Sequence, residues 1–261
     1  MEKPLVSVLM PVYNGEKFLD EAIKSILNQT FKDFELLIVN DASKDESLNI
    51  IKSYKDKRIK VIDNKKNLGF IGALNVGLKH IKSKYVACFN QDDISHNERL
   101  KIEFEYLEKN THIFLVGSSA IYINEKGEEI SKFRKYDNYK MLAWRLKKSN
   151  GIIYPSIMFR NKNVFFDDYY EYNLYYRLLK RGENLTNIPQ FLVKYRVHEG
   201  AMSSYDRENQ RRLMQDVLEK FKDLKANTTL FEKGGYSIKL LFHHLRTMKE
   251  KGRPLSGKEK Q

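Results

Sequence analysis

The first third of the chain alternates between continuous apolar runs and segments with apolar residues at helical spacing. The continuous runs predict buried strands at 5–12, 34–40, 58–63 and 85–90. Between them, apolar residues recur every three or four positions and predict helices near 19–27, 43–54 and 69–81. Ser43 and Glu46 have the spacing of a capping box, which predicts where the second helix begins. This βαβαβαβ order predicts an α/β fold with a mainly parallel sheet and helices on both faces.

The pattern becomes less regular after Ile94. We expect helices at 97–109, 139–147 and 172–182, and strands at 113–124, 128–133 and 151–160. From Tyr205 onward the sequence is typical of helices and is basic, with 14 basic and eight acidic residues. These changes predict an α/β half at 1–110, a second half of the same domain at 111–204 and a basic helical extension at 205–261.

Composition limits the classes to which the chain can belong. Its 261 residues are 41% hydrophobic, which is enough for the core of a large α/β domain. The single cysteine, Cys88, excludes an internal disulfide and fits a reducing compartment. The apolar start is too short for a signal peptide and no run reaches the ~18 apolar residues of a membrane span, so we expect a cytoplasmic protein. The net charge of +13 favours a polyanionic partner: nucleic acid, acidic lipid or a phosphorylated substrate.

Polar residues follow the predicted strands at the edge where a parallel sheet binds ligands. They are Tyr13 and Asn14 after the first strand, Asp41 after the second, and Asp92 and Asp93 after the fourth. An aromatic ring can stack on a nucleobase, a carboxylate can accept a hydrogen bond from it, and paired carboxylates can hold a divalent cation on a diphosphate. Each residue taken singly could instead start or cap a helix. Their concentration at one edge favours a nucleotide site.

Four stretches then follow one another along the chain: "VSVLMPVYNGEKFLDEAIKSILNQTFKDFELLIVNDASKD", "NLGFIGALNVGLKHIKSKYVACFNQDD", "YYEYNLYYRLLKRG" and "YRVHEGAMS". In this order, over roughly residues 5–204, they resemble the successive motifs of family 2 glycosyltransferases, which act on bacterial polysaccharides and cell-surface glycans. The resemblance implies a GT-A fold, a Rossmann-like mixed sheet flanked by helices. It also implies that 1–110 binds a nucleotide-sugar and that 111–204 binds the acceptor and carries the catalytic base.

Donor-binding residues follow from the resemblance by matching positions. It places Pro11, Tyr13 and Asn14 around the base and ribose, Asp41 on the pyrimidine, Asn67 and Asn75 in the donor pocket, and Asp92 at the diphosphate.

The resemblance also implies a metal site and a general base. Asp92 and Asp93 match the end of an Asp-x-Asp-Asp element that holds Mn²⁺ or Mg²⁺, and His198 matches a histidine that approaches the same metal or the diphosphate. Glu171 falls at the position of the general base.

Two departures from the family pattern affect these assignments. Asn90 stands where the family usually has the first aspartate of its metal motif. The common pattern "EDYDLW" is "YEYNLY" at 170–175, so that only Glu171 of its acidic positions remains. Asp167 and Asp168 precede it and are alternative bases if the loop is shifted by three or four residues.

The expected activity is metal-dependent, inverting transfer of a sugar, of the hexosyltransferase type. The donor would be a UDP- or dTDP-sugar and the acceptor a hydroxyl of a glycan or a lipid-linked molecule. Alternatives are a catalytically altered GT-A-like nucleotide-binding protein and a sugar-phosphate nucleotidyltransferase, although the latter normally has a glycine-rich, basic loop after its first strand. No G-x-G-x-x-G or P-loop motif supports an oxidoreductase or phosphotransferase. A nucleic-acid-binding module would leave the strand-end carboxylates unexplained, because they repel phosphate.

The basic extension contains one amphipathic segment. In "YSIKLLFHHLRTMKEKGR", five apolar residues share one helical face: Ile238, Leu241, Phe242, Leu245 and Met248. Such a helix can lie on the anionic inner face of a membrane as a peripheral contact. The alternative is that this face packs on the catalytic domain or on a second subunit of a homo-oligomer.

Overall fold

The computed structural model describes residues 3–134, 138–146, 150–162, 164–167 and 170–201, with positions 212, 215, 216 and 219 beyond them. Contacts group Met1–Leu224 into one compact unit and Lys225–Gln261 into another. The second unit, and with it the predicted amphipathic helix, lies outside the described residues. Within the described ranges no helix is long and apolar enough to cross a lipid bilayer.

Four parallel strands form the first half of the sheet, and all four confirm the sequence prediction. They are β1 (Val6–Val12), β2 (Phe34–Asn40), β3 (Ile59–Asp63) and β4 (Tyr85–Cys88). Their spatial order is β3-β2-β1-β4, with Val12 of β1 opposite Asn40 of β2 at the carboxyl edge. The helices between and after them are α1 (Leu19–Leu27), α2 (Ser47–Ser53), α3 (Gly69–His80) and α4 (Arg99–Lys109). This βαβ alternation produces the parallel α/β half that the hydrophobic pattern predicts.

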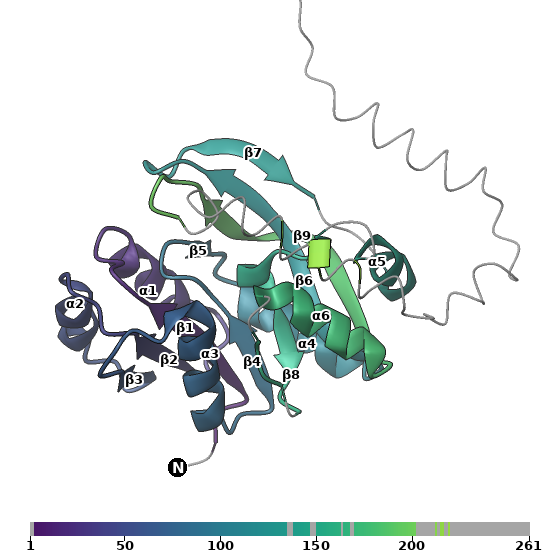
Figure 1. Ribbon diagram of the computed structural model, residues 1–261, viewed down its shortest axis with the longest axis horizontal. Helices are drawn as coiled ribbons and strands as arrows, with labels where there is room; N and C mark the ends of the chain where they lie inside the picture. The colour runs from purple at the N-terminus through teal and green to yellow at the C-terminus, as the bar shows by residue number, and fades with distance from the viewer. Residues whose placement is uncertain are drawn as a thin grey trace, which may run out of the picture. The chain divides into compact units, whose positions relative to one another are not determined.

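Mixed pairing replaces the parallel pattern beyond β4. The further strands are β5 (Ile94–Ser95), β6 (Ile113–Ile123), β7 (Glu129–Phe133), β8 (Met158–Arg160) and β9 (Asn184–Arg196). Across the described residues the nine strands form one sheet of order β3-β2-β1-β4-β8-β6-β9-β5, with β7 paired to β6 (Figure 1). β8 is antiparallel to both β4 and β6, whereas β9 runs parallel to β6. The remaining helices are α5 (Tyr139–Leu146), the short 3₁₀ helix η1 (Tyr154–Ser156) and α6 (Tyr170–Lys180).

The core lies on both faces of the sheet, which explains why β1 is apolar at almost every position. Val8 and Met10 belong to the cluster on the side of α1, α2 and α4, whereas Leu9 belongs to the cluster on the side of α3 and α6. In Figure 1, α3 lies in front of β1 and β2. A Cβ atom on Gly77 would lie 2.2 Å from a methyl group of Leu9, so α3 can approach β1 this closely only with glycine there.

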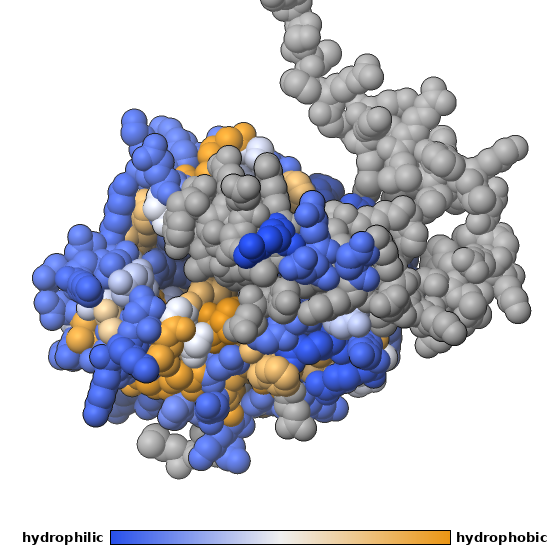
Figure 2. All heavy atoms as spheres, viewed as in Figure 1, coloured by the Kyte–Doolittle hydropathy of each residue, from blue (hydrophilic) through white to orange (hydrophobic). Residues whose placement is uncertain are grey.

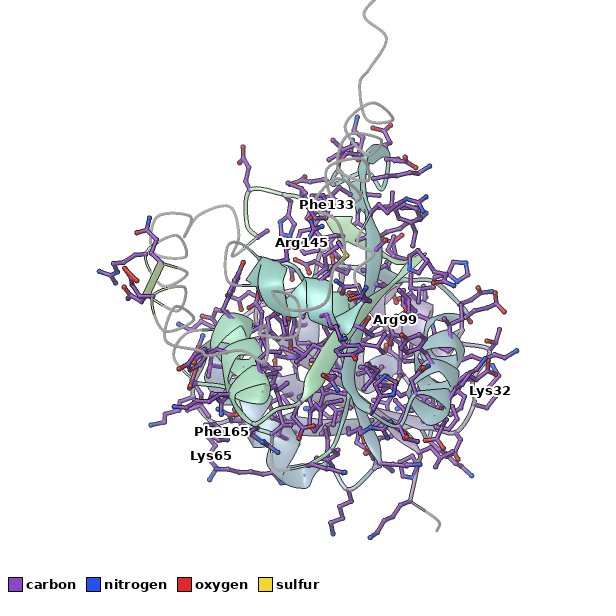
Figure 3. The ribbon with its side chains drawn as sticks, turned by 90° about the vertical axis from the view of Figure 1, so that its right-hand side faces the viewer. Lys32, Lys65, Arg99, Phe133, Arg145 and Phe165 are labelled. Carbon is purple, nitrogen blue, oxygen red and sulfur yellow. The ribbon has the colours of Figure 1, made fainter. Side chains whose placement is uncertain are left out.

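Arg99 fixes the end of β4 from inside the protein. The side chain is fully buried and donates hydrogen bonds to Cys88 O at 2.9 Å and Ile157 O at 3.2 Å. Its Nε donates to the buried Glu103 carboxylate at 2.9 Å. Figure 3 shows Arg99 within the fold, whereas the labelled Lys32 and Lys65 lie at its periphery. The charged pair therefore ties the end of β4, from which the candidate site projects, to the segment that leads into β8.

Two local predictions were wrong, each for an identifiable reason. The Ser43 capping box does not form, because Ser43 Oγ accepts a hydrogen bond from Asn14 N at 3.1 Å and α2 begins at Ser47. The strand predicted at 151–160 exists only from Met158, because Pro155 lacks an N–H group and the segment before it forms η1.

The sequence pattern did not predict β9, although it is the longest of the described strands. Its sequence "NLTNIPQFLVKYR" mixes polar and apolar residues without strict alternation. The pairing of β9 with β6 shifts register between Ile188 and Phe191, where Pro189 interrupts the ladder. β9 is buried on two faces against different neighbours, and its pairing with β6 is irregular. For these reasons its sequence lacks the alternation with a period of two that identifies a strand.

Candidate active site

Tyr13 is held at the end of β1 by a pair of hydrogen bonds to Gln91, which follows β4. Tyr13 N donates to Gln91 Oε1 at 2.8 Å, and Gln91 Nε2 donates to Tyr13 O at 3.1 Å. The Tyr13 side chain is 39% exposed. A Cβ atom on Gly15 would lie 2.6 Å from the Gln91 amide, so this pair of hydrogen bonds also requires glycine at position 15. The arrangement fixes the backbone of Tyr13 and leaves its ring accessible to a ligand.

The loops after β1 and β2 support each other through Asn14. Asn14 has a left-handed backbone with φ of 49°, and its side-chain oxygen accepts a hydrogen bond from Lys44 N at 2.8 Å. Ala42 also has a left-handed backbone, with φ of 60°. This conformation is unfavourable for alanine, and such strain concentrates at functional sites. Pro11 lies within β1 opposite Val39 and is buried, two residues before Tyr13.

Asp41 is buried and binds the segment that leads into α3. Its carboxylate accepts hydrogen bonds from Asn64 Nδ2 at 2.8 Å and from Leu68 N at 3.0 Å to both oxygens. Asn67, one residue earlier, accepts from Gly69 N at 2.7 Å through its side-chain oxygen. The two predicted donor-site residues Asp41 and Asn67 therefore lie on one connected edge, and Figure 2 shows hydrophobic residues over the adjoining α3.

Asp92 and Asp93 have different environments although they are adjacent. Asp93 is only 1% exposed and accepts hydrogen bonds from Arg196 N at 2.8 Å and Asn90 Nδ2 at 3.0 Å. Burial, reinforced by the neighbouring Asp92 charge, raises the pKa of Asp93 well above its usual range. Asp93 is therefore enclosed, whereas the Asp92 side chain is partly exposed, so that the metal role expected of both carboxylates stays a prediction for Asp92 and is disfavoured for Asp93 by its burial. The neutral amide of Asn90 donates a hydrogen bond to the Asp93 carboxylate. An ionised aspartate at position 90 would repel that carboxylate.

The open carboxylate of Asp92 meets His198, which follows the last described strand. Asp92 Oδ2 and His198 Nε2 are 2.9 Å apart, and their side chains are 19% and 13% exposed. The His198 ring packs on Phe18, with ring centroids 4.9 Å apart. The pair brings a carboxylate oxygen and an imidazole nitrogen to one point. Among the described residues no group of three or more His, Cys, Asp or Glu side chains has the arrangement of a complete metal site.

Arg196 connects the elements around this pair, and no sequence pattern indicated its role beyond its position two residues before His198. Arg196 is 2% exposed. Its Nε donates to Asp92 O at 2.9 Å, and its Nη1 donates to Asn124 O and Glu125 O at 3.1 and 2.9 Å. Its Nη2 donates to the carboxylate of Glu21 on α1. One guanidinium thus joins α1, the β6–β7 turn and the loop after β4.

Glu171 lies in the first turn of α6 and forms no ion pair with a described cation. Burial raises the pKa of Glu171 above that of an ordinary glutamate. Burial also raises the pKa of the Cys88 thiol to about 12, and the Glu171 charge contributes to that shift. Cys88, whose pKa the Glu171 charge affects, is the last residue of β4.

Asp167, one of the two alternative bases, is already engaged. Asn173 Nδ2 donates to Asp167 Oδ2 at 2.6 Å, and Arg177 Nε lies 3.5 Å from the same oxygen. Asn173 occupies the third acidic position of the family pattern, and as an amide it can bind Asp167 where a carboxylate would repel it. Asp168, the other alternative, lies outside the described residues.

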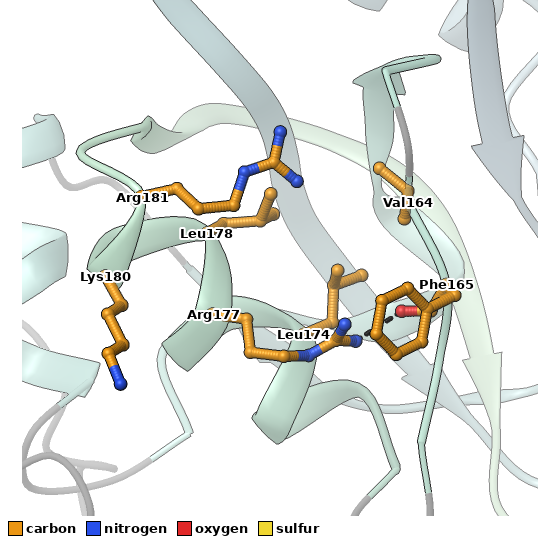
Figure 4. A pocket seen from close by; sticks show the side chains of 7 residues that line it. All are labelled: Val164, Phe165, Leu174, Arg177, Leu178, Lys180 and Arg181. Atoms are coloured by element: carbon orange, nitrogen blue, oxygen red, sulfur yellow. Dashed lines mark hydrogen bonds between the residues drawn. The ribbon is translucent and has the colours of Figure 1, made fainter.

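The segment before α6 is fixed by side chains on both sides. Asn75 Nδ2 donates to Phe166 O, while Phe166 N donates to Asn75 Oδ1, both at 2.8 Å. Arg177 stacks on Phe165 at 3.8 Å and donates to its carbonyl (Figure 4). The Arg177 and Phe165 side chains border a pocket of about 340 Å³ beside the second half of α6, which contains none of the strand-end residues. Asn75 therefore holds the segment that leads into α6, the helix that carries Glu171.

The fold and this edge of the sheet define a class of protein. A Rossmann-like half continuing into a mixed sheet, with polar residues in the loops after β1, β2 and β4 and a carboxylate on a later helix, is the architecture of GT-A glycosyltransferases. The family model for Glycosyl transferase family 2 matches residues 7–184, and the chain belongs to this family.

Known proteins agree with this classification. A protein of Haemophilus influenzae described as an uncharacterized glycosyltransferase is 38% identical over 219 residues, which cover 77% of this chain and 68% of that protein. TarS of S. aureus, solved with UDP-GlcNAc, has a TM-score of 0.67 at 20% identity over 87% of this chain and 68% of its own. The mannosyltransferase PcManGT of Pyrobaculum calidifontis, solved with GDP-Man and Mn²⁺, has a TM-score of 0.68 at 16% identity over 88% and 68%. At these identities the two structures establish the GT-A fold of the chain.

Proposed function

We propose that the protein transfers a sugar, with inversion, from a nucleoside-diphosphate sugar to a hydroxyl of a glycan or lipid-linked acceptor. The observation that carries the proposal is the pairing of Asp92 with His198 at 2.9 Å, and the raised pKa of Glu171 on α6 supports it. The first two supply ligands for a cation at a diphosphate, and the third supplies a base for an acceptor hydroxyl.

The donor nucleotide is assigned to the loops after β1, β2 and β3. The exposed Tyr13 ring stacks on the base, while Pro11, Asn14 and the Asp41–Asn67 edge surround base and ribose. UDP or dTDP fits an aspartate that accepts from a pyrimidine N–H group. The complex of TarS with UDP-GlcNAc supports a uridine donor, whereas the complex of PcManGT with GDP-Man shows that the fold also accepts a purine nucleotide.

The residues after β4 fit a divalent cation. Asp92 offers a carboxylate oxygen and His198 an imidazole nitrogen, and this mixed set favours Mn²⁺, because Mg²⁺ prefers oxygen ligands. Oxygens of the donor diphosphate and water complete the ligand set. When bound, the cation stabilises negative charge on the departing diphosphate. Asp93 fixes the backbone behind Asp92, as its hydrogen bond from Arg196 N indicates.

Glu171 acts as the general base. The acceptor oxygen forms a bond to the anomeric carbon while the bond from that carbon to the diphosphate oxygen breaks. The acceptor proton passes to Glu171, and the electron pair of the broken bond leaves with the nucleoside diphosphate. The raised pKa of Glu171 makes it a stronger base than an exposed glutamate. A reducing, cytoplasmic site of action, with peripheral membrane contact for a lipid-linked acceptor, is consistent with the single buried cysteine and the net charge of +13.

A nucleotide-sugar screen tests the proposal. Thermal unfolding of the full chain is measured with UDP-, dTDP- and GDP-sugars, each with and without Mn²⁺, and nucleoside diphosphate release is then assayed for each sugar that binds. A true donor at 100 times its dissociation constant stabilises the protein by about 2.7 kcal/mol. Stabilisation that needs Mn²⁺, followed by release of the diphosphate, supports the proposal. Binding without turnover supports a catalytically altered nucleotide-binding protein. Absence of stabilisation by every donor contradicts both the transferase and the binding protein.

A further inference from the structure

Three buried tyrosine hydroxyls near Glu171 have no nitrogen or oxygen hydrogen-bond partner among the described residues. They belong to Tyr154 of η1 and to Tyr172 and Tyr175 of α6, with exposures of 6%, 8% and 0%. Tyr85, at the other end of β4, shows the ordinary situation: its buried hydroxyl accepts from Arg160 Nη1 at 2.8 Å and donates to Glu108. A buried polar group without a partner costs free energy, so most native proteins leave few of them.

The three side chains belong to one buried cluster, which includes residues of the helix that carries the proposed base. Tyr172 and Tyr175 follow Glu171 on α6, and their ring centroids are 6.3 Å apart. Tyr175 is one helical turn from Glu171, so the two side chains share a face. Burial raises the pKa of all three tyrosines; the Glu171 charge is the next contribution for Tyr172 and Tyr175, and for Tyr154 it follows those of Cys88.

Aromatic rings hold Tyr154 in place. Its ring lies 5.3 Å from that of Phe70 and 6.1 Å from that of Phe166, in edge-on contacts. Phe166 is itself fixed by the two hydrogen bonds with Asn75. The polar neighbour of the Tyr154 hydroxyl is the Cys88 thiol, which is a weak hydrogen-bonding group. Hydroxyls on immobilised rings that lack a strong partner are pre-organised donors and acceptors, which bind a ligand at little entropic cost.

Building on the proposed function, we propose that Tyr154, Tyr172 and Tyr175 form the acceptor subsite and bind the hydroxyl groups of a sugar residue. Each phenol can both donate and accept, as a polyol requires. The groups that share the cluster are the Glu171 carboxylate and the Cys88 thiol, neither of which attracts an anion, so the phosphate of a lipid carrier binds elsewhere. A site built from such hydroxyls discriminates strongly against acceptors that leave them unpaired.

The test uses isosteric removal of each hydroxyl. Tyr154→Phe, Tyr172→Phe and Tyr175→Phe are assayed with the donor found by the nucleotide-sugar screen. Two products are measured, the free sugar formed with water and the glycoside formed with a panel of methyl hexosides and methyl N-acetylhexosaminides. n-Butanol serves as the monohydroxy comparison. We expect kcat/KM for the best glycoside to fall by about 2- to 12-fold per lost hydrogen bond, with hydrolysis of the donor unchanged. Thermal stability should be equal or higher, because no strong hydrogen bond is lost.

Tyr85→Phe is the matched control, since its hydroxyl is already bonded. It should lower thermal stability and leave the ratio of transfer to hydrolysis unchanged. The proposal is overturned if the three variants transfer to glycosides as the wild type does, which would mean that internal water satisfies the hydroxyls. It is also overturned if n-butanol is as good an acceptor as every glycoside. Absence of any donor turnover is a different result, in which the proposed function itself fails and the acceptor assignment falls with it.

Discussion

Asp92 Oδ2 lies 2.9 Å from His198 Nε2, although 106 residues separate them in the chain. The contact joins the loop after β4 to the segment that follows β9. It sets an open carboxylate against an imidazole, while the adjacent Asp93 is buried behind them. This contact is the basis for the proposed cation site at Asp92 and His198.

Asp92→Asn should weaken Mn²⁺-dependent nucleotide binding by at least about tenfold, because an amide oxygen carries no charge toward the cation. Calorimetric titration of UDP at fixed Mn²⁺ measures the change. Asp56→Asn is the control, because Asp56 pairs with Arg58 at the amino end of β3, away from the strand ends that carry the site, and should leave the titration unchanged. Equal UDP affinity in wild type and Asp92→Asn at limiting Mn²⁺ would remove the metal role of Asp92.

Arg196→Lys should raise the Mn²⁺ concentration needed for half-maximal donor binding. A lysine ammonium cannot reach the separate acceptors Asp92 O, Glu125 O and the Glu21 carboxylate, so the loop that carries Asp92 loses its support. Unpaired buried acceptors should also lower the free energy of unfolding by at least about 2 kcal/mol.

Arg58→Lys separates the two effects of the arginine substitution. Arg58 also binds a carboxylate and a backbone carbonyl, of Asp56 and Leu27, and it lies at the amino end of β3, away from the candidate site. Arg58→Lys should lower the free energy of unfolding without changing the Mn²⁺ concentration needed for half-maximal donor binding. If Arg196→Lys behaves in the same way, Arg196 has a structural role only.

Glu171→Gln should leave donor binding nearly unchanged and reduce transfer by about 10²- to 10⁴-fold, because the amide keeps the shape but cannot take the proton. Asp167→Asn in the same assay should retain most activity, since Asp167 is engaged by Asn173 and Arg177. Full activity of Glu171→Gln together with loss in Asp167→Asn would move the base to Asp167. Asp168→Asn completes the series.

The stability of the protein should fall as pH rises through the range set by Glu103. Burial raises the pKa of Glu103 to about 7, even though Arg99 opposes the shift. A group with a raised pKa stabilises the folded state below its unfolded pKa, and this contribution is lost as pH rises through the folded value. Between the usual 4.5 and about 7 the loss amounts to at most about 3 kcal/mol.

Glu103→Gln isolates this contribution. Urea unfolding of both proteins at pH 5 and pH 8 should show the variant gaining stability relative to the wild type at the higher pH. The amide still accepts the hydrogen bond from Arg99 Nε, so the geometry at the end of β4 is retained. A stability difference that does not change between the two pH values would show that Glu103 stays ionised throughout, held by its partner.

The sequence by itself determined the first half of the fold and most of the candidate residues. Strands β1 and β2 are buried on both faces, and such strands are continuous apolar runs that the hydrophobic pattern identifies without tertiary information. The residues that follow parallel strands must share one edge, because such strands end on the same side. For this reason Tyr13, Asp41 and Asp92 could be grouped from the order of the apolar runs alone.

Only the tertiary structure decided which of these groups is open, buried or already bound. Adjacent carboxylates look alike in sequence, but Asp93 is enclosed by Arg196 N and Asn90 whereas Asp92 faces His198. Arg196 followed no pattern, because its acceptors are mostly backbone carbonyls of distant segments that any residue could supply. The tyrosine hydroxyls around Glu171 were equally hidden: an apolar face at helical spacing predicts burial, but whether a buried hydroxyl finds a partner depends on the packing of elements far apart in the chain.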